Sequence, residues 1–94
     1  MAGRAYRLVV TRPARKDLLD LPPKVSEQVE RAIERLLSRF REGQRPQDMK
    51  RLQGRPHTYR LDSGEYRVLF SVDEDAEIIT IFRVRHRKDV YRHL

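Results

Sequence analysis

Neither cysteine nor tryptophan occurs in this chain of 94 residues, and no apolar run is long enough to cross a membrane. The lack of cysteine excludes disulfides and thiolate metal sites. A transmembrane helix needs about 20 apolar residues, and a secretory signal needs a shorter apolar segment that the first residues also lack. Carboxylates do not cluster as a two-metal nuclease requires. We therefore expect a cytoplasmic protein with no membrane association, no metal and no other cofactor.

Basic residues outnumber acidic ones by 21 to 14, which gives a formal net charge of +7. A chain of this length fits one small domain, and we expect that domain to span residues 1–94. So large a basic excess favours an anionic partner, either nucleic acid or an acidic protein. Composition alone does not distinguish these two kinds of partner.

The amino-terminal half has the pattern of one strand followed by two helices. Residues 6–11 are rich in β-branched side chains, which is typical of a strand. Thr11 is a suitable N-cap for a short helix, which ends at the double proline that begins with Pro22. Over residues 24–42, apolar side chains recur at helical spacing with charged residues off that stripe. This pattern predicts a longer amphipathic helix.

The carboxy-terminal half has the pattern of a polar loop and three strands. The loop covers residues 44–56, and the strands are expected at about 57–62, 65–72 and 77–84. Short links between the strands imply antiparallel pairing, with the helices covering one face. The predicted fold is therefore α+β in the order β-α-α-β-β-β, a small antiparallel sheet with a two-helix hairpin packed on one face.

Arginines lie inside the predicted strands, where a side chain that is always charged needs a defined partner. If the turn at residues 63–64 closes a loop of two or four residues, Arg60 faces Arg67 and both lie on one side of the sheet. A three-residue loop with a bulge would separate them. Either an anion lies between the two guanidinium groups, or they extend into solvent or pair with Asp62 and Glu65.

The last strand repeats this pattern. Arg83, Arg85 and Arg87 alternate and point to one face if the strand extends that far, while His86 points to the other. Guanidinium groups that converge on one sheet face would form a rigid anion site, and a phosphodiester backbone is its natural ligand. Tyr91 fits a packing role at the carboxy terminus as well as a catalytic one.

Two segments together resemble the RelE/ParE superfamily of bacterial and archaeal toxins, and the RelE branch most closely. Residues 52–68 contain the hairpin sequence Gly-x-Tyr-Arg, and residues 84–91 end in His-Arg-x-Asp-Val-Tyr. The resemblance covers essentially the whole chain. It implies a toxin of a type II toxin–antitoxin system with a small curved antiparallel sheet. RelE-type members enter the ribosomal A site and cut mRNA there, so it also implies an endoribonuclease, an mRNA interferase, that inhibits translation.

The resemblance implies roles for individual residues. Arg67 and Arg87 match arginines that contact the scissile phosphate, and Arg87 also serves the leaving group. Tyr91 matches the tyrosine that orients or activates the attacking 2′-hydroxyl, and Arg60 falls where the family often has lysine or arginine. These four are the expected catalytic residues of a reaction without metal. Further basic residues are expected to contact RNA: Lys50, Arg51, Arg83, Arg85 and His86.

Asp62 departs from the family pattern, because many RelE proteins carry a second basic residue at about this position. An acidic side chain there either holds Arg60 or Arg67 in place, or marks a weaker nuclease. The departure bears on the cutting activity more than on the fold.

Two other interpretations stay open. One is a toxin of the ParE-like branch, which inhibits DNA gyrase through protein contacts and cuts no RNA. The other is a nucleic-acid-binding module without activity. Either kind of toxin implies a cognate acidic antitoxin, partly disordered when free, and assembly with it as a heterotetramer.

Overall fold

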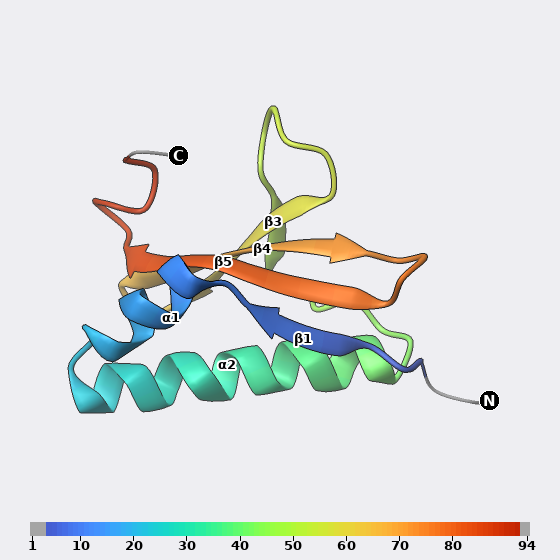
Figure 1. Ribbon diagram of the computed structural model, residues 1–94, viewed down its shortest axis with the longest axis horizontal. Coiled ribbons are helices and arrows are strands. Elements are labelled where there is room, and N and C mark those ends of the chain that lie inside the picture. Colours follow the sequence, from blue (N-terminus) through green and yellow to red (C-terminus); the bar gives the residue numbers. More distant parts are fainter. Residues whose placement is uncertain (1–3, 93–94) are drawn as a thin grey trace.

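The computed structural model describes residues 4–92, which form two helices and five strands (Figure 1). In chain order the elements are β1 (Arg7–Val10), α1 (Arg12–Leu19), α2 (Pro23–Arg41), β2 (Met49–Arg51), β3 (Thr58–Ser63), β4 (Tyr66–Asp73) and β5 (Ile78–His86). Both predicted helices and all four predicted strands are present, close to their expected bounds. Neither of the two described helices combines the length and the apolar character that a membrane span requires.

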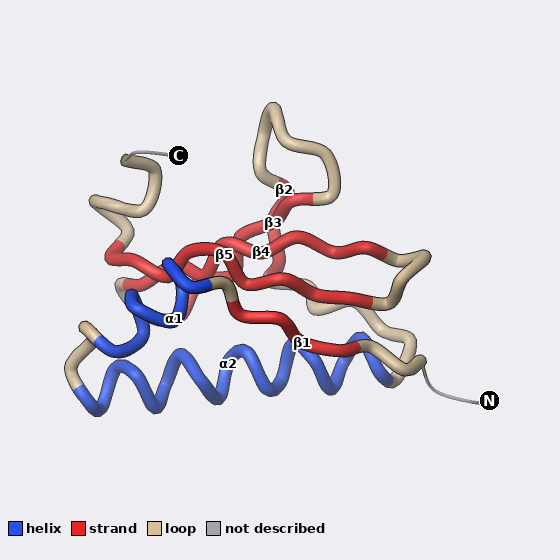
Figure 2. Tube along the Cα trace, in the orientation of Figure 1, coloured by secondary structure: helices blue, strands red, loops and turns tan. Residues whose placement is uncertain are grey.

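The five strands form one sheet in the order β1-β5-β4-β3-β2 (Figure 2). The pairs β3–β4 and β4–β5 are antiparallel, as predicted, and so is the pair β2–β3, but β1 runs parallel to β5. The sheet is therefore mixed and not wholly antiparallel. A hairpin turn forces the two strands that it joins to run in opposite directions. No such turn links β1 to β5, so the direction of β1 is not constrained in this way.

β2 is a strand that the sequence does not predict, because it lies in the polar segment assigned to a loop. Its three residues pair with Tyr59–Leu61 of β3 at the edge of the sheet. Short edge strands carry charged residues and have no apolar alternation, so propensity gives little signal for them. This pairing places Lys50 directly opposite Arg60, so the two basic side chains point to the same face of the sheet.

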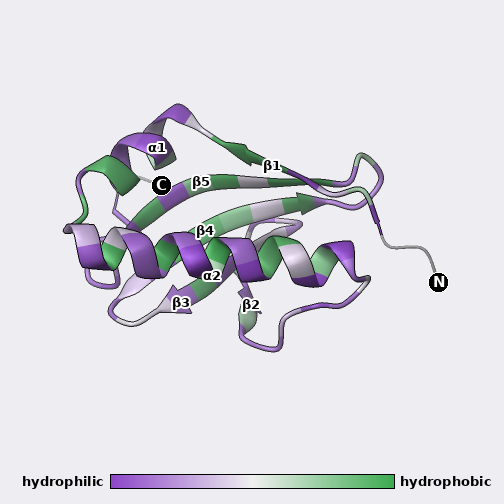
Figure 3. Cartoon of the chain, turned by 90° about the horizontal axis from the view of Figure 1, so that it is seen from below, coloured by the Kyte–Doolittle hydropathy of each residue, from purple (hydrophilic) through white to green (hydrophobic). Residues whose placement is uncertain are grey.

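α2 covers one face of the sheet, and Figure 3 shows its hydrophobic and hydrophilic residues alternating along the helix. Val29, Ile33, Leu36 and Phe40 are buried at helical spacing and pack in one core with strand residues such as Phe70. α1 lies beside β5, beyond the point at which the β1–β5 pairing ends. The α+β class and the helical layer on one face are confirmed.

The start of α1 depends on Thr11. Its Oγ1 accepts a hydrogen bond from the backbone N–H of Ala14 at 3.3 Å, while its own N–H donates to the carbonyl of Ile81 at 3.0 Å. We expect Thr11→Ala to lower the free energy of unfolding by about 1 kcal/mol, because the helix loses its side-chain cap. Chemical denaturation measures the change. Thr11→Ser keeps the accepting hydroxyl and should stay near the wild type; equal losses in both variants would contradict the capping role.

The turn between β3 and β4 sets which residues meet across the hairpin. The loop is Gly64-Glu65, with Ser63 paired to Tyr66. Gly64 has a φ of 56°, as the first position of such a two-residue loop requires. The loop thus lies one residue later than expected, and the predicted pairing of Arg60 with Arg67 is wrong.

The shift of the turn does not change the face to which each residue points. Asp62 faces Arg67, and Arg60 faces Leu69. Residues two apart on a strand share a face, so Arg60 and Arg67 still lie on the same side, as diagonal neighbours. The prediction that Arg60 and Arg67 lie on one side of the sheet is therefore correct, although the β3 residue directly opposite Arg67 is Asp62.

Candidate functional site

Basic side chains line the face of the sheet that points away from α2. Two cross-strand rows define it: Lys50, Arg60, Leu69 and Arg83 form the first, and Asp62, Arg67 and Arg85 form the second. Their sequence neighbours, such as Leu61, Val68 and Val84, point into the core under α2. We call the five basic residues of these rows, Lys50, Arg60, Arg67, Arg83 and Arg85, the basic face.

Leu69 lies at the centre of the basic face and is fully buried. It is the cross-strand partner of both Arg60 and Arg83. The side chains of these arginines are only 21% and 22% exposed, so their aliphatic stems lie along the sheet while their guanidinium groups are held by carboxylates. Both guanidinium groups are thereby partly shielded from solvent and paired with an acid.

Arg60 and Arg67 share one carboxylate. Asp62 Oδ1 lies 3.5 Å from Arg60 Nη1 and 3.2 Å from Arg67 Nε. This arrangement realises one of the alternatives left open by the sequence, in which Asp62 holds the arginines of the hairpin. It also brings two guanidinium groups from neighbouring strands to a single anionic oxygen.

Tyr91 reaches the same cluster from the end of the chain. After β5, hydrogen bonds from the N–H groups of Asp89 and Val90 to the carbonyl of His86, at 2.8 and 3.0 Å, turn the chain back. Arg67 Nη1 then donates to the Tyr91 hydroxyl at 3.4 Å, and the guanidinium carbon lies 5.9 Å from the centre of the ring. Tyr91 is 45% exposed, so its side chain is partly open to solvent beside Arg67.

Arg87 lies at the edge of this cluster, next to the β3–β4 turn. Its backbone N–H donates to the carbonyl of Glu65 at 2.8 Å, which extends the β4–β5 pairing by one step. Its Nε contacts Glu65 Oε2 at 2.8 Å in an ion pair that is open to solvent. On the β5 side, the cross-strand partner of Arg67 is Arg85, and two like charges in that position repel.

Asp17 of α1 is a member of the site that the sequence analysis missed. Its carboxylate is only 7% exposed and lies 3.1 Å from Arg83 Nε and 3.4 Å from Arg85 Nε. It also accepts a hydrogen bond from the N–H of Val84 at 2.9 Å, on the side of β5 where the pairing with β1 has already ended. A signal was present: Asp17 falls between Ala14 and residues 18–21 on the apolar side of its helix, where a charge requires a partner.

Two of the expected RNA-contacting residues do not lie on the basic face. Arg51 is paired with Tyr59, whose side chain stacks on Phe70 in the core, so it points to the helix side of the sheet. His86 is paired with Tyr66 and meets its ring edge-on, with 5.4 Å between the ring centres. Lys50, Arg83 and Arg85 do share the face of Arg60 and Arg67.

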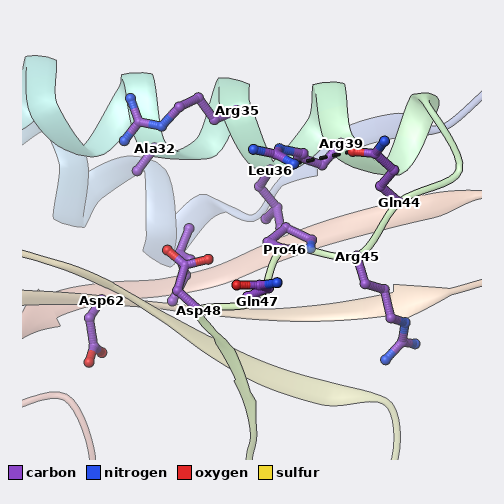
Figure 4. A pocket seen from close by; sticks show the side chains of 11 residues that line it. Ala32, Arg35, Leu36, Arg39, Gln44, Arg45, Pro46, Gln47, Asp48 and Asp62 are labelled. Atoms are coloured by element: carbon purple, nitrogen blue, oxygen red, sulfur yellow. Dashed lines mark hydrogen bonds between the residues drawn. The ribbon is translucent and has the colours of Figure 1, made fainter.

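A groove of about 690 Å³ lies on the other side of the sheet edge, between α2 and the segment that leads to β2 (Figure 4). Arg39 donates to Gln44 there at 3.2 Å, and Arg35 also borders the space. Hydrogen bonds to Tyr59 and Glu74 raise the pKa of the neighbouring Arg45. Asp62 borders this groove, but in Figure 4 its carboxylate points away from α2. The groove and the basic face therefore meet at Asp62.

Comparison with known proteins places the chain in a family. Residues 8–91 match the model of the ParE toxin of the type II toxin–antitoxin system parDE. The chain is 35% identical over 89 residues to toxin RelG of Mycobacterium tuberculosis, a match that covers 93% of this chain and 97% of RelG. It is also 35% identical over 78 residues to putative toxin RelE1 of Methanocaldococcus jannaschii, covering 83% and 86% of the two chains.

A solved structure gives the same assignment. A chain of the toxin–antitoxin complex RelBE2 from Mycobacterium tuberculosis superimposes with a TM-score of 0.68 at 34% identity, covering 87% of this chain and 98% of that one. The protein belongs to the RelE/ParE superfamily, on its RelE-type branch, and is a toxin of a type II toxin–antitoxin system.

Proposed function

We propose that this toxin is a ribosome-dependent mRNA endoribonuclease that cuts mRNA in the ribosomal A site and so inhibits translation in the cytoplasm. One observation carries the proposal: Arg60, Arg67 and Tyr91 come from three parts of the chain and meet on one sheet face. The similarity to proteins named RelG and RelE1 supports it. A cationic cluster beside an accessible phenol suits a phosphodiester substrate better than an uncharged one.

The chemistry uses the nucleophile that RNA itself supplies. Arg60 and Arg67 bind the scissile phosphate, and Tyr91 orients the adjacent 2′-hydroxyl for in-line attack. The bond from the 2′-oxygen to phosphorus forms as the bond to the 5′-oxygen breaks. The products are a 2′,3′-cyclic phosphate and a 5′-hydroxyl, and the proton lost by the 2′-hydroxyl is balanced by the one gained at the 5′-oxygen. A well-placed donor to the developing charge contributes about 3–4 kcal/mol to lowering the barrier.

The remaining basic residues take supporting roles in this proposal. Arg87, beside the hairpin turn, assists departure of the 5′-oxygen once Glu65 gives up its ion pair. Lys50, Arg83 and Arg85 bind neighbouring phosphates along the same face. Arg51 and His86 point to the other side of the sheet, so they would contact a different part of the ribosome-bound RNA. The net charge of +7 favours binding to the ribosome as a whole.

We also propose that a cognate acidic antitoxin binds this toxin, in an assembly such as a heterotetramer. The similar Mycobacterium tuberculosis structure is a toxin–antitoxin complex. An acidic chain is complementary to the basic face, and covering that face would prevent RNA from reaching Arg67 and Tyr91.

Tyr91→Phe tests the proposed mechanism. Removing the hydroxyl that meets Arg67 should slow ribosome-dependent mRNA cleavage by about 10²-fold, because the nucleophile loses its orientation. Primer extension on an mRNA in translating ribosomes measures the cut. Tyr66→Phe is the matched control, since Tyr66 points to the opposite side of the sheet. Unchanged cleavage by Tyr91→Phe would remove the hydroxyl from the mechanism.

A second function, inhibition of DNA gyrase, is favoured by the match to the ParE toxin model. Parallel assays of mRNA cleavage and of DNA breakage by gyrase, with the same purified protein, distinguish the two functions. Cuts in the A-site codon support the nuclease. Gyrase-dependent DNA breaks, with mRNA intact, would support the gyrase inhibitor and overturn the nuclease proposal.

A further inference from the structure

We propose that Asp62 is an internal counter-ion that occupies the phosphate position between Arg60 and Arg67, so that RNA must displace it to bind. The inference rests on the proposed function and identifies a residue that limits the affinity of the same site. A single oxygen, Asp62 Oδ1, makes both contacts, at 3.5 Å to Arg60 Nη1 and 3.2 Å to Arg67 Nε. An oxygen of a phosphodiester has the charge and the size to take that place.

The contacts of Asp62 leave the donors of the arginines incompletely used. Arg60 Nη1 is buried and makes no hydrogen bond of good geometry within the described residues. Its contact with Asp62 Oδ1, at 3.5 Å, is an ion pair without a hydrogen bond. A tetrahedral phosphate, with oxygens pointing in several directions, can satisfy two guanidinium groups at once better than one carboxylate oxygen does. The cluster therefore holds capacity for a further acceptor.

Comparison with Asp17 shows why Asp62 can move aside. Both carboxylates hold two arginines of the basic face, but Asp17 is buried and also accepts a hydrogen bond from the backbone of Val84. The side chain of Asp62 is 45% exposed, and the hydrogen bonds from backbone N–H groups to carboxylates found among residues 4–92 go to Asp73 and Asp17, not to Asp62. A rotation about its side chain exposes it to water and releases Arg60 and Arg67 together.

Two anions cannot share the position. With the carboxylate in place, an incoming phosphate meets a like charge within contact distance in a partly desolvated site. The negative charge of Asp62 therefore lowers the affinity of the face for RNA while keeping the arginines ordered when RNA is absent. Asparagine has the same shape without the charge, so Asp62→Asn separates the two effects.

Asp62→Asn should bind a short RNA about 3- to 10-fold more tightly than the wild type, the range expected for removing two partly exposed ion pairs that compete with the ligand. The probe is a fluorescent 2′-O-methyl RNA oligonucleotide, which cannot be cut, and the readout is anisotropy at fixed low salt. Asp75→Asn is the matched control, because it makes the same change of charge in the exposed β4–β5 turn. In an Arg67→Ala background the gain from Asp62→Asn should shrink.

Binding and cleavage together distinguish the two proposals. Tighter binding by Asp62→Asn than by Asp75→Asn supports the counter-ion role, even if neither the variant nor the wild type cuts mRNA on ribosomes. The absence of cleavage would overturn the nuclease proposal alone. Cleavage by the wild type with no gain in RNA affinity for Asp62→Asn over Asp75→Asn would overturn the counter-ion role alone. Thermal unfolding of each variant confirms that the compared proteins are folded.

Discussion

Asp17→Ala should lower the free energy of unfolding by about 3 kcal/mol, which corresponds to a fall of roughly 12–24 °C in Tm for a domain of this size. The substitution removes the acceptor of the Val84 N–H and the counter-ion of Arg83 and Arg85 in one step. Breaking a fully buried ion pair typically costs 3–5 kcal/mol. The two arginines are 22% and 36% exposed and regain some hydration, so we expect the lower end of that range.

Asp17→Asn tests which part of this loss is electrostatic. The amide oxygen can still accept from the N–H of Val84, so we expect about half the loss seen with alanine. Asp20→Ala is a suitable control, because Asp20 is an exposed acid at the end of the same helix. A drop in Tm no larger for Asp17→Ala than for Asp20→Ala would contradict the assigned role. Urea denaturation and thermal scans both report the difference.

Arg67→Ala should reduce ribosome-dependent cleavage by about 10³-fold, the upper end of the effect of removing one preorganised donor. Arg67 contacts both Asp62 and Tyr91, so its loss removes a phosphate ligand and the contact that holds the Tyr91 hydroxyl. The single-turnover cleavage rate on programmed ribosomes is the appropriate measurement, because it isolates the chemical step from toxin release.

Two further variants separate charge from geometry at this position. Arg67→Lys keeps the charge but loses the planar pair of donors, so its rate should lie between those of the wild type and of alanine. Arg31→Ala removes an equal charge from an exposed ion pair on α2 and should leave the rate within about twofold. If Arg67→Ala were no slower than Arg31→Ala, the basic face would not be the active site.

The fold class was predictable because it depends on patterns that are local in the chain. The stripe that includes Val29, Ile33 and Phe40 predicts α2, and the cap at Thr11 marks the start of α1. β2 was missed because a three-residue edge strand has no apolar alternation. The parallel direction of β1 was missed because no turn connects it to β5. Both features arise from pairing between distant segments.

The part of the candidate site that depends on local patterns in the chain was also predictable. Alternation alone places Arg83 and Arg85 on one face, and parity across a two-residue loop places Arg60 and Arg67 together. The exact partner of Arg67 required the position of the turn, which the φ of Gly64 decides. Arg51 and His86 were assigned to RNA on their charge and on the family resemblance, and register puts them on the other side of the sheet.

The sequence by itself determined the elements, the strongly basic balance and the alternation that gathers arginines on one face, because each of these depends on residues only a few positions apart. The tertiary structure alone decided which carboxylate meets which arginine. Asp17 lies 67 residues before Val84 in the chain, and it reaches β5 only because α1 packs where β1 ends. Contacts across such distances are set by the packing of whole elements, and no local pattern records them.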